Sequence, residues 1–147
     1  MAATRTADVT WRGDLLSGSG AVDYVGSGAF ARMPVTWRAR TEASDGRTSP
    51  EELLAAAHAS CFAMAFSSRL AKAGHPPTSL SVRATVTFDK GDAGWFVASS
   101  ALVVTGLVPD MAAAEFAAIA DDAKDNCPIS QALKGNVAIS VTATLEG

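Results

Sequence analysis

A long and almost uninterrupted apolar stretch dominates the pattern of hydrophobic and polar positions. Between Leu53 and Phe66 only His58 and Ser60 are clearly polar. Such a stretch predicts a helix that is apolar on every side, and a helix of that kind must also be covered on every side. We therefore predict a central helix over residues 49–73, around which the rest of the chain is organised.

Both ends of this helix carry residues that favour helix termini. Ser49 is a good N-cap, Pro50 suits the first helical position, and Glu52 completes a capping box with Ser49. Gly74 is typical of the position that follows a helix, and Pro76 prevents the helix from continuing.

After the central helix the pattern changes to alternation, which is typical of half-buried strands. Residues 79–106 predict two antiparallel strands, and residues 136–145 predict a last strand. Between them we predict a helix over residues 110–126, with Asp110 as its N-cap, and a short helix over residues 128–134. The inward side chains of the first strand are Leu80, Val82, Ala84, Val86 and Phe88.

The N-terminal part, residues 6–40, predicts short strands separated by turns that are rich in glycine and serine. Residues 35–40 alternate in polarity, which predicts a strand with Arg38 and Arg40 on one face. The order of elements predicts a single α+β domain over residues 1–147 with mainly antiparallel pairing. The few amphipathic strands and helices of one chain cannot cover every side of a fully apolar helix. We therefore expect a homodimer that packs two such helices between two sheets.

Charge and hydropathy exclude two classes of partner. The net charge of −3 and the pI near 5.2, without a basic run, argue against nucleic acid as the main partner. Uninterrupted apolar runs such as Leu53 to Ala57 are too short to span a bilayer. The N-terminus also lacks the apolar segment of a signal peptide, so we expect a cytoplasmic protein with no membrane partner.

The two cysteines, Cys61 and Cys127, are the first candidates for chemistry. A free cysteine is usually a small buried hydrophobic residue, and in the cytoplasm the alternative is a redox pair. Cys127 directly precedes Pro128 at a predicted helix start, where the helix dipole and free N–H groups favour a thiolate. Cys61 lies in mid-helix and needs a nearby cation. The residues alone therefore predict that Cys127 is the more acidic thiol.

His58 lies one helical turn before Cys61 and allows three interpretations. A zinc site would need two further ligands, and the chain has two histidines, two cysteines and no C-x-x-C. A Cys–His nucleophile pair is not favoured, because neighbours at i and i+3 on a helix rarely align for proton transfer. The residues favour a packed histidine with satisfied hydrogen bonds.

Arg40 and Arg38 are the candidates for the cation that Cys61 needs; the alternative is that both belong to a solvated strand face. Glu51 is a helix-start charge ten residues before Cys61, which is about 15 Å along a helix axis. The two side chains cannot meet through one straight helix. If both serve one site, Glu51 acts through a long arginine or comes from a second subunit.

Two longer motifs resemble a known family. T-S-P-E-E-L-L-A-A-A-H-A-S-C-F-A-M-A surrounds the first cysteine, and D-N-C-P-I-S-Q-A-L-K surrounds the second. Supporting stretches are W-R-G-D-L-L-S-G-S-G near the N-terminus and A-G-H-P-P-T-S-L after the central helix. With these motifs the chain resembles the OsmC/Ohr family of thiol peroxidases over nearly its whole length, and the OsmC branch more closely.

The resemblance implies roles for four residues. Cys61 matches the peroxidatic cysteine, whose thiolate attacks the peroxide oxygen and becomes a sulfenic acid. Cys127 matches the resolving cysteine, which condenses with Cys61 to a disulfide. Arg40 matches the arginine that holds the thiolate, with Arg38 as the alternative, and Glu51 matches the carboxylate that orients this arginine.

The resemblance also implies a fold and a reaction. The fold is an intertwined homodimer with antiparallel sheets wrapped around two long central helices. The substrates are organic hydroperoxides and, less efficiently, hydrogen peroxide, with a dithiol reductant such as a dihydrolipoyl protein and without a cofactor or metal. The alternative function is a peroxide sensor or a module that binds a lipid-like ligand without turnover. A dithiol–disulfide exchange protein is not favoured, because C-x-x-C is absent.

Overall fold

The computed structural model describes residues 1–146 and divides the chain into two compact units. The first unit is Met1–Leu53, and the second begins at Leu54. The boundary falls near the start of the long helix α2 (Pro50–Lys72).

The first unit is a three-stranded antiparallel sheet followed by a short helix. The strands β1 (Ala7–Arg12), β2 (Ser19–Val25) and β3 (Ala31–Val35) lie in the order β1-β2-β3. The helix α1 (Trp37–Thr41) comes next. Large hydrophobic side chains of this sheet are exposed, whereas Val22 is its one buried hydrophobic residue. The first unit therefore has little core of its own.

The prediction of a strand over residues 35–40 was wrong, because residues 37–41 form the helix α1. Thr36 acts as an N-cap: its side-chain oxygen accepts a hydrogen bond from the N–H of Ala39 at 3.0 Å. This local capping bond outweighs the short alternation in polarity. As a result Arg38 and Arg40 do not share a strand face. Arg38 pairs with Glu42 at 3.2 Å on the exposed surface of α1.

The predicted ends of α2 are confirmed. The hydroxyl of Ser49 accepts a hydrogen bond from the N–H of Glu52 at 3.1 Å. The carboxylate of Glu52 accepts one from the hydroxyl of Thr48 at 2.9 Å instead of returning to Ser49. At the other end Gly74 has a φ of +90°, and the N–H of His75 closes the last turn on the carbonyl of Leu70 at 2.9 Å.

The second unit contains a sheet with mixed pairing. The strands β4 (Ser79–Gly91) and β5 (Gly94–Leu107) form an antiparallel hairpin. The last strand, β6 (Ala138–Glu146), pairs with β5 in parallel, so the order is β4-β5-β6. The parallel pair departs from the antiparallel sheets that were predicted, because the intervening helices form the crossover that a parallel connection needs.

Two helices form this crossover, α3 (Ala113–Asn126) and α4 (Pro128–Leu133). The predicted start of α3 at Asp110 was wrong. Asp110 has a φ of +57° and lies in a turn, and the helix begins after Ala112 without a side-chain cap. The junction between the two helices is Cys127, which is both the C-cap of α3 and the N-cap of α4.

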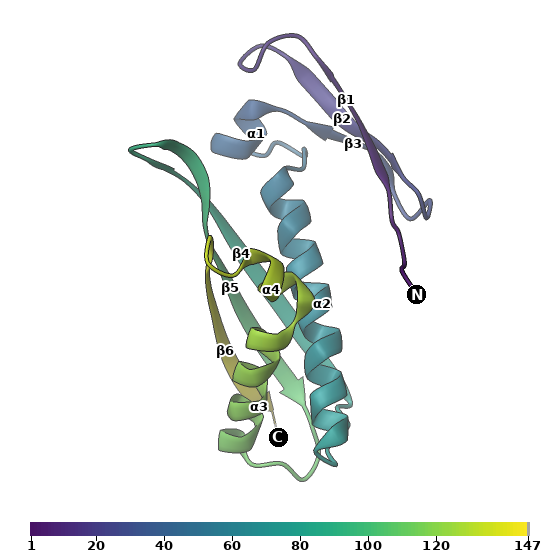
Figure 1. The fold of residues 1–147 in the computed structure, drawn as a ribbon, viewed down its shortest axis with the longest axis vertical. Coiled ribbons are helices and arrows are strands. Elements are labelled where there is room, and N and C mark those ends of the chain that lie inside the picture. Colours follow the sequence, from purple (N-terminus) through teal and green to yellow (C-terminus); the bar gives the residue numbers. More distant parts are fainter. Residues whose placement is uncertain (147) are drawn as a thin grey trace. The chain divides into compact units, whose positions relative to one another are not determined.

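The helices cover one face of the β4-β5-β6 sheet, as Figure 1 shows. Phe66 of α2 lies at the centre of this core, with its ring 5.4 Å from that of Phe62 and 4.9 Å from that of Phe116 in α3. From Leu80 to Phe88 the even-numbered residues of β4 are half-buried and the odd-numbered ones exposed, which confirms the predicted alternation. The core contains Phe62, Phe66, Leu70, Leu102, Val104, Val108, Phe116, Ala120, Ala123 and Cys127.

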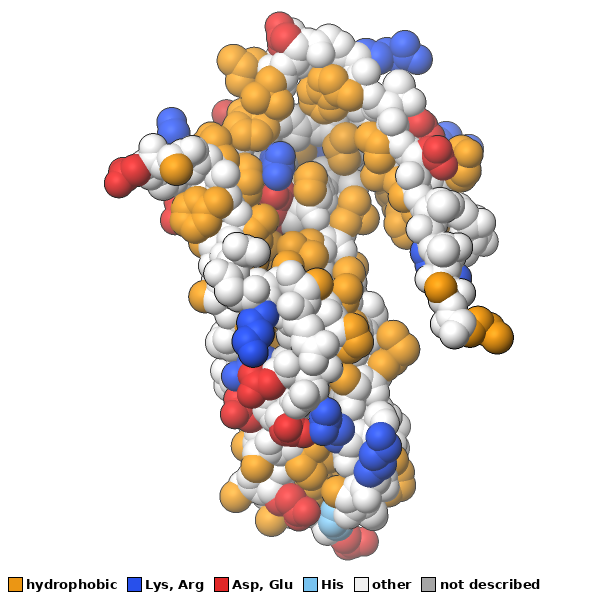
Figure 2. Space-filling model, in the orientation of Figure 1, with side chains coloured by type: hydrophobic (Ala, Val, Ile, Leu, Met, Phe, Trp, Pro, Cys, Tyr) orange, Lys and Arg blue, Asp and Glu red, His pale blue; other side chains and the backbone are white. Residues whose placement is uncertain are grey.

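The side of α2 that faces away from this core is bare. From His58 onward every fourth residue of α2 is buried, whereas residues on the opposite side are exposed, and Figure 2 shows hydrophobic side chains at the surface along this helix. By length and composition α2 is apolar enough to cross a membrane, with 22% of its most apolar window buried. Counting uninterrupted apolar runs missed this, because single polar residues break the runs. The exposed stripe consists of Ala56, Ser60, Met64 and Ser68.

Candidate active site

Arg40 and Glu51 form a bidentate ion pair in the first unit. Nε of Arg40 donates to both carboxylate oxygens of Glu51, at 2.9 and 3.1 Å, and a terminal guanidinium nitrogen lies 2.9 Å from Oε1. Glu51 is 8% exposed, and the guanidinium carbon of Arg40 lies 5.8 Å from the ring centroid of Trp37. The charge of Glu51 thus fixes the direction of Arg40. Of the two candidate arginines, only Arg40 is paired with Glu51.

The two cysteines meet inside the second unit. Cys61 is half-buried on α2, and Cys127 is completely buried at the α3–α4 junction. Both are free thiols, and Cys127 lies close enough to Cys61 to raise its pKa. Both belong to the packing of one core. Two residues that are far apart in the sequence therefore lie near each other in this core.

The surroundings of Cys61 act on its pKa in both directions. Burial raises the pKa of this thiol, and the neighbouring Cys127 raises it further, whereas a hydrogen bond from the backbone N–H of Ile129 lowers it. None of these groups is positively charged. A reactive thiolate at this position therefore needs a cation in addition to the groups of its own core.

The side chain of Cys127 does not cap the helix that it precedes. Cys127 is the N-cap of α4, but its side chain makes no capping hydrogen bond. The free amide of this helix start, from Ile129, serves Cys61 instead. From sequence position, we expected the free amides at the start of α4 to act on Cys127, which is adjacent. In the structure the amide of Ile129 acts on Cys61, which belongs to another helix.

His58 is fully buried and bonded at both ring nitrogens. Its Nδ1 lies 2.6 Å from the hydroxyl of Ser100 on β5, and its Nε2 lies 2.8 Å from the hydroxyl of Ser130 on α4. Burial lowers the pKa of His58. This confirms the predicted packed histidine. Both nitrogens are engaged by serines, so neither is directed at Cys61 as a base.

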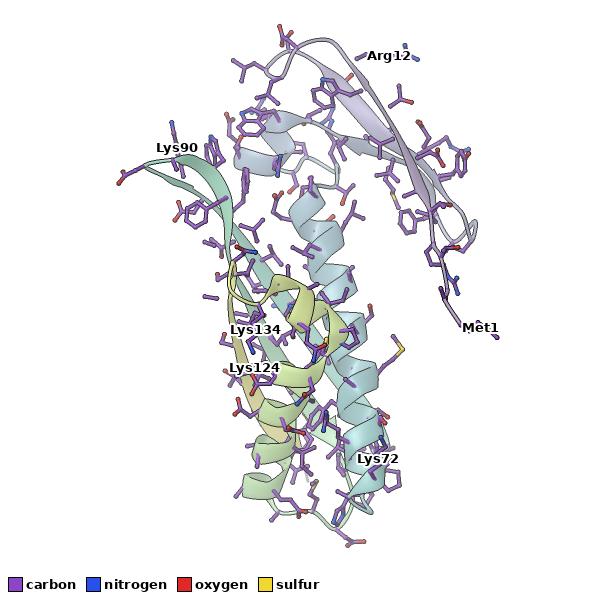
Figure 3. The ribbon with its side chains drawn as sticks, in the orientation of Figure 1. Met1, Arg12, Lys72, Lys90, Lys124 and Lys134 are labelled. Atoms are coloured by element: carbon purple, nitrogen blue, oxygen red, sulfur yellow. The ribbon has the colours of Figure 1, made fainter. Side chains whose placement is uncertain are left out.

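No group of three or more potential metal ligands was found among residues 1–146. A shallow cavity of the second unit lies beside α4 and β6, and neither cysteine lines it. Figure 3 shows two of its lining residues, Lys124 and Lys134, on the same side of the sheet. Lys124 is held by Asp121 at 2.9 Å. The two thiols therefore do not face this cavity.

Comparison with known proteins relates the chain to one family. A family model described as OsmC-like protein matches residues 43–142. The chain is 42% identical over 129 residues to Peroxiredoxin OsmC of Escherichia coli (strain K12), an alignment that covers 88% of this chain and 89% of that protein. The match to Peroxiredoxin OsmC of Shigella flexneri has the same identity and coverage.

Solved structures show the same fold. The organic hydroperoxide resistance protein of Elizabethkingia anophelis matches with a TM-score of 0.75 and 22% identity, covering 99% of this chain and 100% of that one. OhrB of Bacillus subtilis, an organic hydroperoxide resistance protein, matches with a TM-score of 0.70 and 24% identity, covering 96% and 98%. The chain therefore belongs to the OsmC/Ohr family and is a thiol-dependent peroxidase.

Proposed function

We propose that this chain reduces organic hydroperoxides, and hydrogen peroxide less efficiently, with Cys61 as the peroxidatic cysteine and Cys127 as the resolving cysteine. The observation that carries the proposal is the proximity of these two thiols inside one core. Only a pair that lies close together can close a disulfide without a large movement of the helices that carry it. Two fold relatives are named organic hydroperoxide resistance proteins, which supports the class of substrate.

In the first proposed step the Cys61 thiolate attacks one oxygen of the hydroperoxide. A sulfur–oxygen bond forms, the oxygen–oxygen bond breaks, and the alkoxide leaves and takes up a proton as the alcohol. The sulfur loses two electrons and becomes a sulfenic acid. The amide of Ile129 assists by stabilising the thiolate that starts the step.

In the second proposed step the thiol of Cys127 attacks the sulfenic sulfur. A disulfide forms and the oxygen leaves as water, which protects Cys61 from irreversible oxidation. A dithiol reductant, such as a dihydrolipoyl protein, then reduces the disulfide by exchange and becomes a disulfide itself. Because sulfur atoms carry the electrons throughout, the cycle uses only thiols and peroxide.

We propose Arg40 as the cation that the Cys61 thiolate needs. An arginine suits this role because it stays charged even when it is partly buried. Its bidentate pair with Glu51 supports the proposal, since a buried carboxylate that fixes one guanidinium is an expensive arrangement on a surface without a function. Glu51 acts through Arg40 and is therefore a positioning residue.

We also propose that the protein is a homodimer, in which the bare stripe of α2 is covered by a second copy. The stripe runs along several turns of an apolar helix, and its largest member, Met64, is 68% exposed in one chain. A large exposed hydrophobic side chain on a helix that is otherwise almost wholly apolar supports an interface at this face. The small size of the other three residues lets a second helix approach closely.

A turnover assay tests the proposed function. The purified protein is mixed with excess dihydrolipoamide and an organic hydroperoxide, and peroxide consumption is followed against an equal dose of hydrogen peroxide. We expect many turnovers per chain and a higher rate with the organic hydroperoxide. The rival function, a sensor or a binding module for a lipid-like ligand, predicts at most one equivalent of peroxide consumed per Cys61, after which consumption stops.

A further inference from the structure

We propose that His58 is a positioning residue for the second chemical step, because it locks α4 onto α2 and so keeps the Cys127 thiol beside Cys61. The inference rests on the proposed function, in which Cys127 resolves the sulfenic acid. It assigns a task to a buried titratable group that the peroxide step does not use.

The geometry that points to this role is a chain of two hydrogen bonds, in which His58 lies between Ser100 and Ser130. His58 lies on α2 one turn before Cys61, and Ser130 lies on α4 three residues after Cys127. The bond of 2.8 Å between His58 and Ser130 therefore ties together the two helices that carry the reacting sulfurs. The bond of 2.6 Å to Ser100 fastens the same ring to β5.

The short helix α4 is attached to the core through few residues, Ile129 among them. Ser130 is the buried residue of α4, which is six residues long. A neutral imidazole donates at one nitrogen and accepts at the other, so it can bridge two hydroxyls without leaving a buried polar atom unsatisfied. Among residues 1–146 no buried side-chain nitrogen or oxygen lacks a partner. An apolar residue at position 58 would fill space, but it would not fix the register of α4.

The position of α4 along α2 matters because a disulfide forms only within a small range of distances and angles. The β-carbons of a disulfide lie about 3.5–4.5 Å apart, so a small slide of α4 removes Cys127 from the line of attack. The attack of Cys61 on peroxide depends on α4 only through the amide of Ile129, which stabilises the thiolate but carries no reacting atom. Loss of the His58–Ser130 bond should therefore slow condensation more than it slows the peroxide step.

Two serine variants separate positioning from general stability. Ser130→Ala removes the bond to α4, and Ser100→Ala removes a bond of the same kind to β5 while it leaves the link between the helices. Single-turnover kinetics with one equivalent of an organic hydroperoxide measure two rates: sulfenic acid formation, trapped with a dimedone probe, and loss of the second thiol. Both variants are first checked for wild-type folding by circular dichroism.

We expect Ser130→Ala to slow loss of the second thiol by about tenfold to 10²-fold, the range for misplacement by about 1 Å. Its sulfenic acid formation should slow by a smaller factor, and excess peroxide should convert more of its Cys61 to sulfinic acid. Ser100→Ala should condense at the wild-type rate. His58→Ala should behave like Ser130→Ala, and Ser130→Thr, which keeps the hydroxyl, should restore the rate.

Equal slowing in both serine variants would overturn the inference, because it would show a general effect of a loosened core. Wild-type condensation in Ser130→Ala and His58→Ala would overturn it as well. These outcomes leave the proposed function intact, since the wild-type chain still forms its disulfide. If the wild-type chain forms no disulfide at all, the proposed function and this inference fail together.

Discussion

Arg40 donates two hydrogen bonds from Nε to the carboxylate of Glu51, at 2.9 and 3.1 Å, across eleven positions of the sequence. Glu51 is nearly buried, whereas the other arginine of the same helix, Arg38, pairs on the open surface with Glu42. The two arginines differ by only two positions, yet one is fixed in direction and the other is solvated. They form a natural test pair.

Replacing Arg40 with methionine should lower peroxide turnover by roughly 10²–10³-fold, the usual cost of removing one preorganised electrostatic group from an active site. The reason is that Cys61 would lose the positive charge that its thiolate needs. The measurement is kcat/KM for an organic hydroperoxide under steady-state conditions with a dithiol donor.

Arg38→Met is the matched control for this prediction. An exposed ion pair is worth about 0–1 kcal/mol, and Arg38 is 69% exposed, so its loss should leave turnover close to that of the wild type. If Arg38→Met lost peroxide turnover and Arg40→Met kept it, the assignment of Arg40 would be refuted.

Replacing Cys127 with serine should lower the pKa of Cys61 relative to the wild type. Burial is the largest cause that raises this pKa and it remains in the variant, but the additional rise caused by the neighbouring Cys127 is removed. The thiolate of Cys61 should therefore be present at lower pH. The measurement is the alkylation rate of reduced Cys61 against pH.

The wild-type comparison uses the same alkylating reagent and reads Cys61 by peptide mass. A profile for Cys127→Ser that moves to higher pH would contradict the electrostatic effect of Cys127 on Cys61. An unmoved profile would show that Cys127 has no effect on the pKa of Cys61.

His58 makes the folded protein sensitive to acid. Burial lowers the pKa of His58 below the usual 6.5, so the unfolded chain binds the proton more readily than the folded chain. The stability due to the neutral ring is fully present above pH 6.5 and is lost as pH falls toward the lowered pKa. The loss should approach about 1.4 kcal/mol per pH unit within that window.

Urea unfolding of the reduced protein at a series of pH values between 7 and 5 measures this slope. His58→Gln, which has no titrating ring, should be less stable than the wild type at pH 7 and should show a shallower loss on acidification. An identical slope in both proteins would assign the acid sensitivity to other groups.

Local signals explain what the sequence predicted well. The start of α2 at Ser49 and its end at Gly74 depend on capping residues that are adjacent in the sequence. The alternation along β4 likewise reports directly on which face is buried. Both cysteines also stood out, because a free cysteine is rare and its surrounding motif is long.

The errors arose where local patterns were ambiguous or where partners are distant. The six-residue alternation around Trp37 fits a strand equally well, but the N-cap of Thr36 makes it a helix. Ser100 and Ser130 could not be recognised as site residues, because they meet His58 across 42 and 72 positions. A lone serine in a strand or a short helix carries no signal of such a contact.

The dimer proposal predicts that a charge on the bare stripe of α2 separates the subunits. Met64→Glu would force an unpaired carboxylate into an apolar interface, which costs several kcal/mol. Sedimentation should show the wild type at twice the 15.0 kDa chain mass and Met64→Glu at the mass of one chain. Thr85→Glu, on the exposed face of β4, should remain dimeric. A wild-type protein that sediments as one chain would refute the proposal.

The most direct test of the central claim is a free-thiol count combined with intact mass, before and after one equivalent of an organic hydroperoxide. If Cys61 and Cys127 form the redox pair, both thiols should disappear and the mass should fall by about 2 Da, the two hydrogens lost in one disulfide. Cys61→Ser should then keep its remaining thiol and consume no peroxide. Two intact thiols in the folded, reduced wild-type protein after this treatment would contradict the claim.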